Sequence, residues 1–173
     1  MARGYDAVGV QEIVETAGVT KPSLYHYFSS KRGLLDALLK EHFEELNAEI
    51  RQAACYEHDL TGTLQKLAQV YFSFAQKQPD FYRMQISMQF ASPDCEPCQA
   101  VLPYILEQHG LLESMFAQAA LDHGNMRSRQ SAYAATFLGM VNTYIAMFLN
   151  GYAELGETLA FQATHQFMHG IYS

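Results

Sequence analysis

The sequence predicts an all-α protein with a small N-terminal head and a larger helical body. Apolar residues recur at spacings of three and four along most of the chain, which is the period of amphipathic helices. Hydrophobic residues make up 49% of the chain, with only 11 glycines and 5 prolines, a composition typical of ordered globular proteins. We find neither the alternation of β-strands nor an internal repeat.

Two short helices joined by a tight turn are predicted near the N-terminus. The first, residues 10–17, ends at Gly18, because glycine readily adopts the left-handed conformation that closes a helix. The second, residues 21–28, follows Thr20, a good N-cap, and carries Pro22 in its first turn, where proline is tolerated. Such a pair with a glycine-containing turn is typical of a helix-turn-helix unit.

Longer helices follow. Ser29 and Ser30 are predicted to cap a helix that begins at Lys31 and reaches residue 54, long enough to leave the head and enter the body. A polar loop spans residues 91–97, and Pro79 separates two of the later helices. The remaining helices are predicted at residues 60–78, 81–90, 98–122, 126–150 and 156–172.

The helix pattern divides the chain into a helix-turn-helix head of residues 1–50 and a helical body of residues 51–173. The net charge is −7, but residues 1–34 hold four basic and three acidic groups, so the excess negative charge lies beyond them. Phosphate binding depends on local cations and helix N-termini. The charge distribution is thus compatible with DNA binding without demonstrating it.

Residues 4–31 resemble the head of the TetR family of repressors. The resemblance is carried by the Ala-Gly-Val-Thr turn of residues 17–20, the Leu-Tyr-His-Tyr-Phe run of residues 24–28 and the helix start at Ser30-Lys31. It implies a ligand-responsive repressor that binds double-stranded operator DNA as a homodimer. The head of residues 1–50 would bind DNA, and the body of residues 51–173 would bind the effector and form the dimer through the last two helices. A small apolar or aromatic effector would release the DNA. The three cysteines, an odd number, argue against a disulfide framework and fit a cytoplasmic location.

The resemblance also implies that the helix of residues 21–28 enters the major groove. Lys21 and Lys31 would supply cations, and the Thr20 hydroxyl and helix N-termini would offer further phosphate contacts. The implied DNA-binding positions are Gly9, Val10, Thr20, Lys21, Pro22, Ser23, Tyr25, His26, Tyr27 and Lys31.

In the body, aromatic and methionine stripes at helical spacing are core by default, and we expect a subset to line an apolar cavity. The predicted ligand-binding residues are Tyr71, Phe74, Phe81, Met84, Met88, Met115, Tyr133, Phe137, Met140 and Tyr144. Small residues among large ones in the last two helices favour close helix packing. The predicted dimer interface comprises Ala135, Leu138, Gly139, Asn142, Ile145, Ala163 and Phe167.

The sequence departs from the family pattern at its start. The family's head begins with a further helix, and Met1-Ala2-Arg3 resembles only its last residues. We therefore expect most of that helix to be missing, which removes a packing partner from Val10, Ile13, Leu24 and Phe28. The alternative function is a helical dimeric ligand-binding or interaction protein that has lost DNA binding through this truncation.

We also searched the sequence for enzyme motifs, metal or redox sites and membrane spans. The chain lacks the metalloprotease, nucleophile-elbow, phosphate-loop and di-iron motifs, so we predict neither an enzyme nor a cofactor. Cys95 and Cys98 have C-x-x-C spacing, which we interpret as an incidental loop pair, with a redox or metal role as the alternative. His165 and His169 lie one helical turn apart, and we predict a surface or interface pair rather than a metal site. The sequence contains no run of 18 or more apolar residues, so we predict no membrane-spanning helix.

Overall fold

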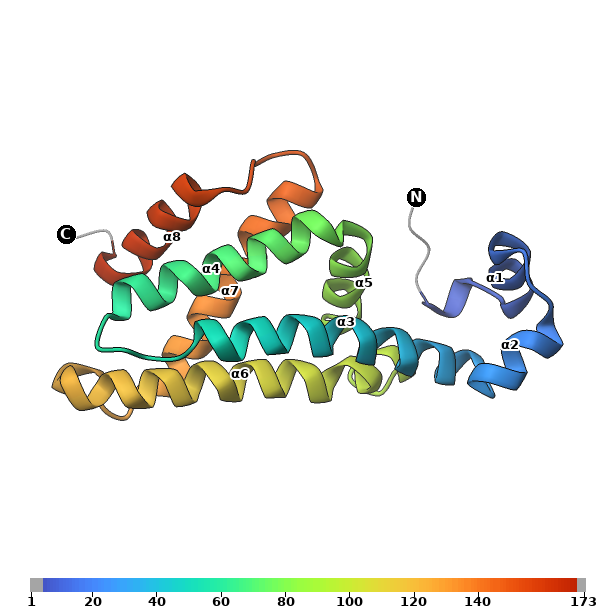
Figure 1. Ribbon diagram of the computed structural model, residues 1–173, viewed down its shortest axis with the longest axis horizontal. Helices are drawn as coiled ribbons and strands as arrows, with labels where there is room; N and C mark the ends of the chain where they lie inside the picture. The colour runs from blue at the N-terminus through green and yellow to red at the C-terminus, as the bar shows by residue number, and fades with distance from the viewer. Residues whose placement is uncertain (1–4, 171–173) are drawn as a thin grey trace.

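The computed structural model describes residues 5–170, and within this range it contains helices and no strand, which confirms the all-α prediction (Figure 1). Residues 1–4, of which the first three are interpreted above as the end of a further helix, lie outside the described range, as do residues 171–173. The helices are α1 (Val10–Ala17), α2 (Lys21–Phe28), α3 (Lys31–Ala53), α4 (Leu60–Lys77), α5 (Pro79–Gln89), α6 (Glu96–Asp122), α7 (Gln130–Leu149) and α8 (Glu157–His169), with 3₁₀ helices η1 (Tyr5–Ala7) and η2 (Gly124–Met126).

The head, which comprises η1, α1 and α2, forms where the local sequence signals predict it. Gly18 ends α1 with a φ of 67°, in the left-handed region that favours glycine. The Thr20 hydroxyl accepts a hydrogen bond from the Ser23 amide at 3.3 Å and caps α2. Ser30 caps α3 in the same way, through the Gly33 amide at 2.9 Å. These structures confirm the predicted turn and caps.

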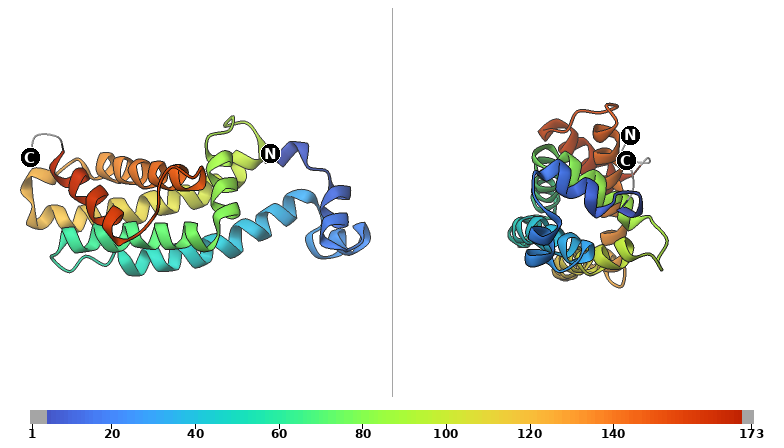
Figure 2. Two further views of the ribbon diagram at one scale, coloured as in Figure 1. Left: turned by 90° about the horizontal axis from the view of Figure 1, so that it is seen from above. Right: turned by 90° about the vertical axis from the view of Figure 1, so that its right-hand side faces the viewer.

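Helix α3 joins the head to the body. Its 23 residues span about 34 Å at 1.5 Å per residue. One face, with Leu39, Phe43, Leu46 and Ile50, is buried in the body at the spacing of an amphipathic helix. The head therefore projects beyond the end of the body, which Figure 2 shows from above.

The body packs the remaining helices around α3. Helices α4 and α6 both pack against α3, α5 packs against α4, α6 and α7, while α7 packs on α6 and α8 on α4. A buried polar chain links three of these helices: the Tyr71 hydroxyl donates to Gln108 at 3.3 Å, and the Gln108 amide donates to Asn47 at 2.9 Å. These bonds satisfy polar groups that would otherwise cost free energy in the core.

Three helix starts differ by two or more residues from the predicted boundaries. Helix α5 begins at Pro79, because proline fits the first helical position. Helix α6 begins at Glu96 instead of residue 98, because Cys95 caps it and Pro97 lies in its first turn. Helix α7 begins at Gln130 instead of residue 126, because the short η2 helix and an extended Arg127 precede it.

Among the described helices, only α7 is long and apolar enough to cross a membrane by length and composition. Only 22% of its most apolar stretch of 18 residues is buried within the protein. An apolar helix so little covered by its own protomer has a face available for a partner. Its exposed positions are treated below with the predicted dimer interface.

Candidate nucleic-acid interface and effector cavity

Helix α2 packs one side against α1 and α3 and exposes the other side to solvent. Leu24 is 4% exposed and Phe28 is half-buried, because this side packs against α1 and α3. Tyr25 and Tyr27 are 46% and 75% exposed. Aromatic side chains are usually covered, so two large exposed rings on one short helix indicate a surface that contacts a partner.

Most of the predicted DNA-binding residues belong to α2 or cap it, and the others lie at the starts of α1 and α3. Thr20 and Lys21 lie at the N-terminus of α2, where the backbone amides and the helix dipole favour anions. Of the predicted set, the exposed residues are Gly9, Thr20, Lys21, Pro22, Tyr25, His26 and Tyr27, and the half-buried ones are Val10, Ser23 and Lys31. Their contact with DNA stays a prediction.

Lys31 has partners within the protein. Its Nζ donates to the Tyr5 carbonyl oxygen at 2.5 Å and lies 4.0 Å from the centre of the Tyr5 ring. The ammonium group thus ties η1 to the first turn of α3 through a hydrogen bond and a cation–π contact. A contact with phosphate would have to compete with this arrangement, whereas Lys21 is exposed.

The angle between α2 and α3 depends on a close backbone approach. A Cβ atom at Gly33 would lie 1.9 Å from the Phe28 carbonyl oxygen, which belongs to the last residue of α2. Glycine is therefore the residue that allows the end of α2 to lie against the first turn of α3. Ser29, between the two helices, has a φ of 61° and completes this tight connection.

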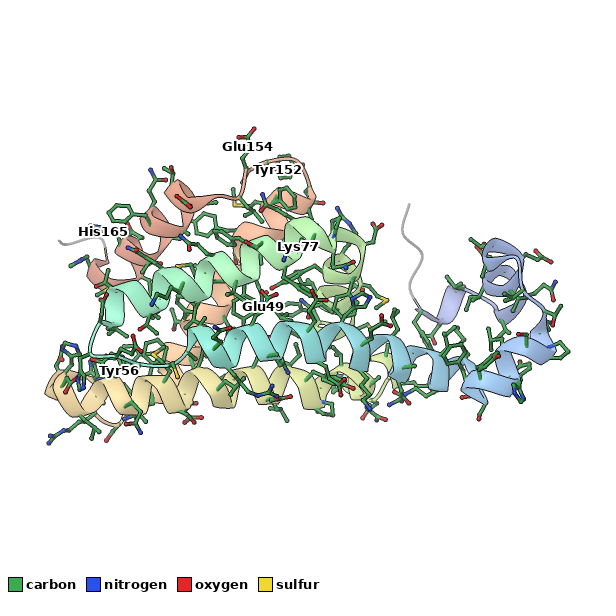
Figure 3. The ribbon with its side chains drawn as sticks, in the orientation of Figure 1. Glu49, Tyr56, Lys77, Tyr152, Glu154 and His165 are labelled. Atoms are coloured by element: carbon green, nitrogen blue, oxygen red, sulfur yellow. The ribbon has the colours of Figure 1, made fainter. Side chains whose placement is uncertain are left out.

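A cavity of about 390 Å³ lies at the end of the body away from the head, and we call it the distal cavity. This end is marked by Tyr56 in Figure 3. The volume falls within the usual range of small-molecule sites. Its apolar walls come from four helices and η2 and include Leu64, Phe116, Met126, Tyr133 and Phe167, and its polar rim includes His58, Thr61, His123 and Asn125.

Three side chains beside this rim, those of Tyr56, His58 and Asp122, are linked by hydrogen bonds. The carboxylate of Asp122 accepts a bond from the Tyr56 hydroxyl at 2.9 Å and lies 2.6 Å from Nδ1 of His58. The hydrogen bonds to His58 and then Tyr56 lower the pKa of Asp122. The group joins the connection between α3 and α4 to the C-terminal end of α6, and so fixes one edge of the distal cavity.

A second cavity, of about 540 Å³, lies between the head and the body, and we call it the junction cavity. Head residues Tyr5, Val8 and Ile13 face Met84 and Met88 of α5 across it. Leucines of α3 complete its apolar lining, and Lys31, Asp80 and Arg83 lie at its rim. Because both parts of the molecule contribute, its shape depends on how the head sits on the body.

The structure distributes the predicted ligand-binding residues over three places. Tyr133 lines the distal cavity, and Met84 and Met88 line the junction cavity. Residues buried in the core are Tyr71, Phe74, Phe81, Met115 and Phe137, and Met140 and Tyr144 are half-buried. The predicted set lacks three residues that line the distal cavity, Phe116, His58 and His123. Phe116 was missed because aromatic residues of a core and of a cavity wall recur at the same helical spacing. The two histidines lie on connections, where periodicity gives no signal.

The predicted interface residues are also divided. Ile145 and Ala163 are buried within the protomer, Leu138, Asn142 and Phe167 are half-buried, and Ala135 and Gly139 are exposed. Asn142 accepts a hydrogen bond from the Tyr82 hydroxyl at 2.7 Å. On α7 the exposed residues that follow one another at helical spacing are Ala135, Thr136, Gly139, Thr143 and Met147.

The two histidines of α8 lie together at the surface. The rings of His165 and His169 are 4.4 Å apart, and both residues are exposed. Within residues 5–170, no group of three or more histidine, cysteine, aspartate or glutamate residues is placed to hold a metal ion.

Comparison with known proteins agrees with this geometry. The family model described as "Bacterial regulatory proteins, tetR family" matches residues 1–38, which include α1, α2 and the first part of α3. The chain is 28% identical to the HTH-type transcriptional activator FasR of Mycolicibacterium smegmatis over 168 residues, covering 97% of this chain and 75% of that protein.

Solved structures share the whole fold. A putative fatty acid metabolism regulator of Clostridium perfringens matches with a TM-score of 0.82 at 20% identity, covering 98% of this chain and 91% of that one. The transcriptional regulator FadR of Bacillus subtilis, in complex with stearoyl-CoA, matches with a TM-score of 0.80 at 16% identity over the same shares. The likeness therefore extends through the body as well as the head.

Proposed function

We propose that the chain is a bacterial transcriptional regulator of the TetR family, a homodimeric repressor whose operator binding is controlled by an apolar effector. It is a regulator rather than an enzyme. The observation that carries the DNA-binding part is the exposed side of α2, where Lys21, Tyr25 and Tyr27 face solvent beside a capped helix N-terminus. We place its action in the cytoplasm, where the operator is.

Lys21→Ala tests the placement of α2 on DNA. Removing one phosphate contact should weaken binding to all sequences and lower the slope of log affinity against log salt by up to about 0.9. The measurement is fluorescence anisotropy with DNA from upstream of the protein's own gene, at several salt concentrations. Lys66→Ala on α4 is the matched control, since Lys66 is exposed on the body. An unchanged slope in Lys21→Ala would contradict the proposed orientation of α2.

The exposed face of α7 supports the dimer. Ala135, Gly139 and Met147 lie on it at helical spacing, and Phe161 of α8 is 54% exposed. Small residues allow two helices to approach closely, and large exposed apolar side chains favour burial against a second copy. A two-fold dimer also presents two copies of α2 to the two half-sites of an operator.

We place the effector in the distal cavity. Its apolar walls and polar rim suit an amphipathic ligand with an acyl chain or ring and a polar end group. FadR of Bacillus subtilis was solved with stearoyl-CoA, and this supports an acyl-chain effector here. The cavity touches α4 and α6, which pack on α3, and also α7 and α8. Occupancy would therefore shift α3 and alter the spacing of the two heads, provided the ligand binds the two arrangements unequally.

Tyr133→Ala tests the effector site. We expect stearoyl-CoA, titrated by isothermal calorimetry, to bind about tenfold more weakly, which corresponds to about 1.4 kcal/mol. Tyr144→Ala is the control, because Tyr144 is half-buried on the same helix but does not line the distal cavity. Equal weakening by both substitutions would place the effector elsewhere, and equal operator affinity of the loaded and free protein would contradict the proposed control.

The alternative of an interaction protein without DNA binding is not favoured. The family model spans the head, and α2 keeps its cap and its exposed polar and aromatic side chains. FasR is a transcriptional activator by its name, so the sign of regulation needs its own measurement. A reporter driven by the upstream region should rise when the gene is deleted, and a fall would make the protein an activator.

A further inference from the structure

We propose that Cys95 and Cys98 form a reversible redox site that hydroperoxides oxidise to an intrachain disulfide, and that the head responds to its state. Neither cysteine belongs to the DNA surface or to the two cavities described above. The site replaces our interpretation of the pair as incidental loop cysteines.

The two cysteines lie three residues apart at the N-terminal end of α6. Cys95 is the N-cap residue, with extended backbone angles, and its Sγ accepts a hydrogen bond from the Cys98 amide at 3.4 Å. Residues three apart in a helix have Cβ atoms about 5–6 Å apart, and a disulfide needs about 3.5–4.5 Å. Because Cys95 lies outside the helix proper, a small rotation of its backbone and side chain closes this gap.

The surroundings favour reaction at Cys95. Its sulfur lies at the N-terminal end of a 27-residue helix, where the backbone amides and the helix dipole favour negative charge. Both cysteines are partly exposed, so a small oxidant can reach them. Cys55 follows the C-terminal end of α3, whereas Glu96 contacts the N-terminal turn of that helix. The length of α3, about 34 Å, therefore separates Cys55 from the pair.

Glu96, which follows Cys95, contacts the first turn of α3, the helix that follows α2. The Glu96 carbonyl oxygen accepts a hydrogen bond from Nη1 of Arg32 at 3.3 Å, and its carboxylate lies 3.9 Å from the same nitrogen. The pKa of Tyr5 is raised, first by burial, and then by the negative charge of Glu96 and a hydrogen bond between the two side chains. Glu96 thus touches both η1 and the first turn of α3, and a disulfide that moves residues 95–98 must disturb these contacts.

Hydroperoxide supplies the two-electron oxidant that disulfide formation between Cys95 and Cys98 requires. The Cys95 thiolate attacks one peroxide oxygen, the O–O bond breaks, and a sulfenic acid and water form after proton uptake. The Cys98 thiolate then attacks the Cys95 sulfur, the S–O bond breaks, and a second water leaves. Two thiols lose two electrons and two protons to one hydrogen peroxide, and a dithiol reductant reverses the change.

The test uses the full chain with Cys55→Ser, so that only the pair remains. Hydrogen peroxide should remove both thiols that iodoacetamide alkylates, yield a peptide bridged between Cys95 and Cys98, and leave both thiols recoverable by dithiothreitol. In the same background, Cys98→Ser should stop at a dimedone-reactive sulfenic acid. Retention of both thiols, or only intermolecular disulfides, would overturn the proposal.

Amide hydrogen exchange tests the link to the head. Oxidation should speed exchange over residues 31–36 in Cys55→Ser, while peroxide should leave the doubly substituted Cys55→Ser, Cys95→Ser protein unchanged there. Formation of the disulfide with unchanged exchange in this segment would overturn the link. Neither readout involves DNA, so their failure is distinguishable from failure of the proposed operator binding.

Discussion

Gly33→Ala should destabilise the protein and abolish tight operator binding, although alanine is normally the better helix residue. In a helix interior the change gains roughly 0.5–1 kcal/mol. Here the new Cβ would lie 1.9 Å from the Phe28 carbonyl oxygen, so the end of α2 must move. Overpacking of this kind typically costs about 1–3 kcal/mol. We expect the displaced α2 to lose its fit to the major groove, measured by anisotropy with operator DNA.

Gly110→Ala is the matched control for this prediction. Gly110 lies inside α6, and a Cβ there would meet no atom within 4 Å. It should therefore raise the free energy of unfolding by about 0.5–1 kcal/mol and leave DNA affinity unchanged. If both glycine substitutions stabilised the protein equally, the close approach of α2 to α3 would not exist in solution.

Phe137→Ala should lower the free energy of unfolding by about 3–5 kcal/mol, as expected for a large side chain removed from a packed core. Phe137 is 0% exposed and its ring packs edge-on against Phe167 at 5.5 Å between centroids. It does not line either cavity, although the sequence predicted a ligand contact. Urea unfolding at a fixed protein concentration measures the loss, because dimer formation adds to apparent stability.

Phe90→Ala is the control for the core substitution. Phe90 follows α5 and is 76% exposed, so its removal should change the free energy of unfolding by no more than about 0.5 kcal/mol. A loss below about 1 kcal/mol in Phe137→Ala would show that the residue stands at a cavity wall after all, and the distal cavity would then be larger than described.

The helix boundaries of the head could be predicted more accurately than those of the body, because the sequence signals in the head are local. Gly18, Thr20 and Ser30 each act within one helical turn, through a left-handed backbone or a side-chain cap, and the structure shows each of them. The start of α6 was missed because cysteine is not a usual cap, so the chemistry that begins this helix resembled a loop.

The effector cavity could not be predicted because it is defined by what neighbouring helices leave unfilled. Tyr133 and Phe137 lie one turn apart on α7 and carry the same aromatic signal, yet one lines the distal cavity and the other fills the core. His58 and His123 lie on separate connections that meet only in the folded chain. Periodicity reports which face of a helix is apolar, but the partner of that face is a tertiary property.

Hydroxyl-radical footprinting on DNA from upstream of the gene tests dimeric operator binding through α2 most directly. We expect two protected half-sites related by a two-fold axis, with centres about 34–36 Å apart or a multiple of that distance. Both should weaken together in Lys21→Ala, since each protomer contributes one copy of α2. A single protected patch, or no protection at any salt concentration, would contradict dimeric operator binding by this chain.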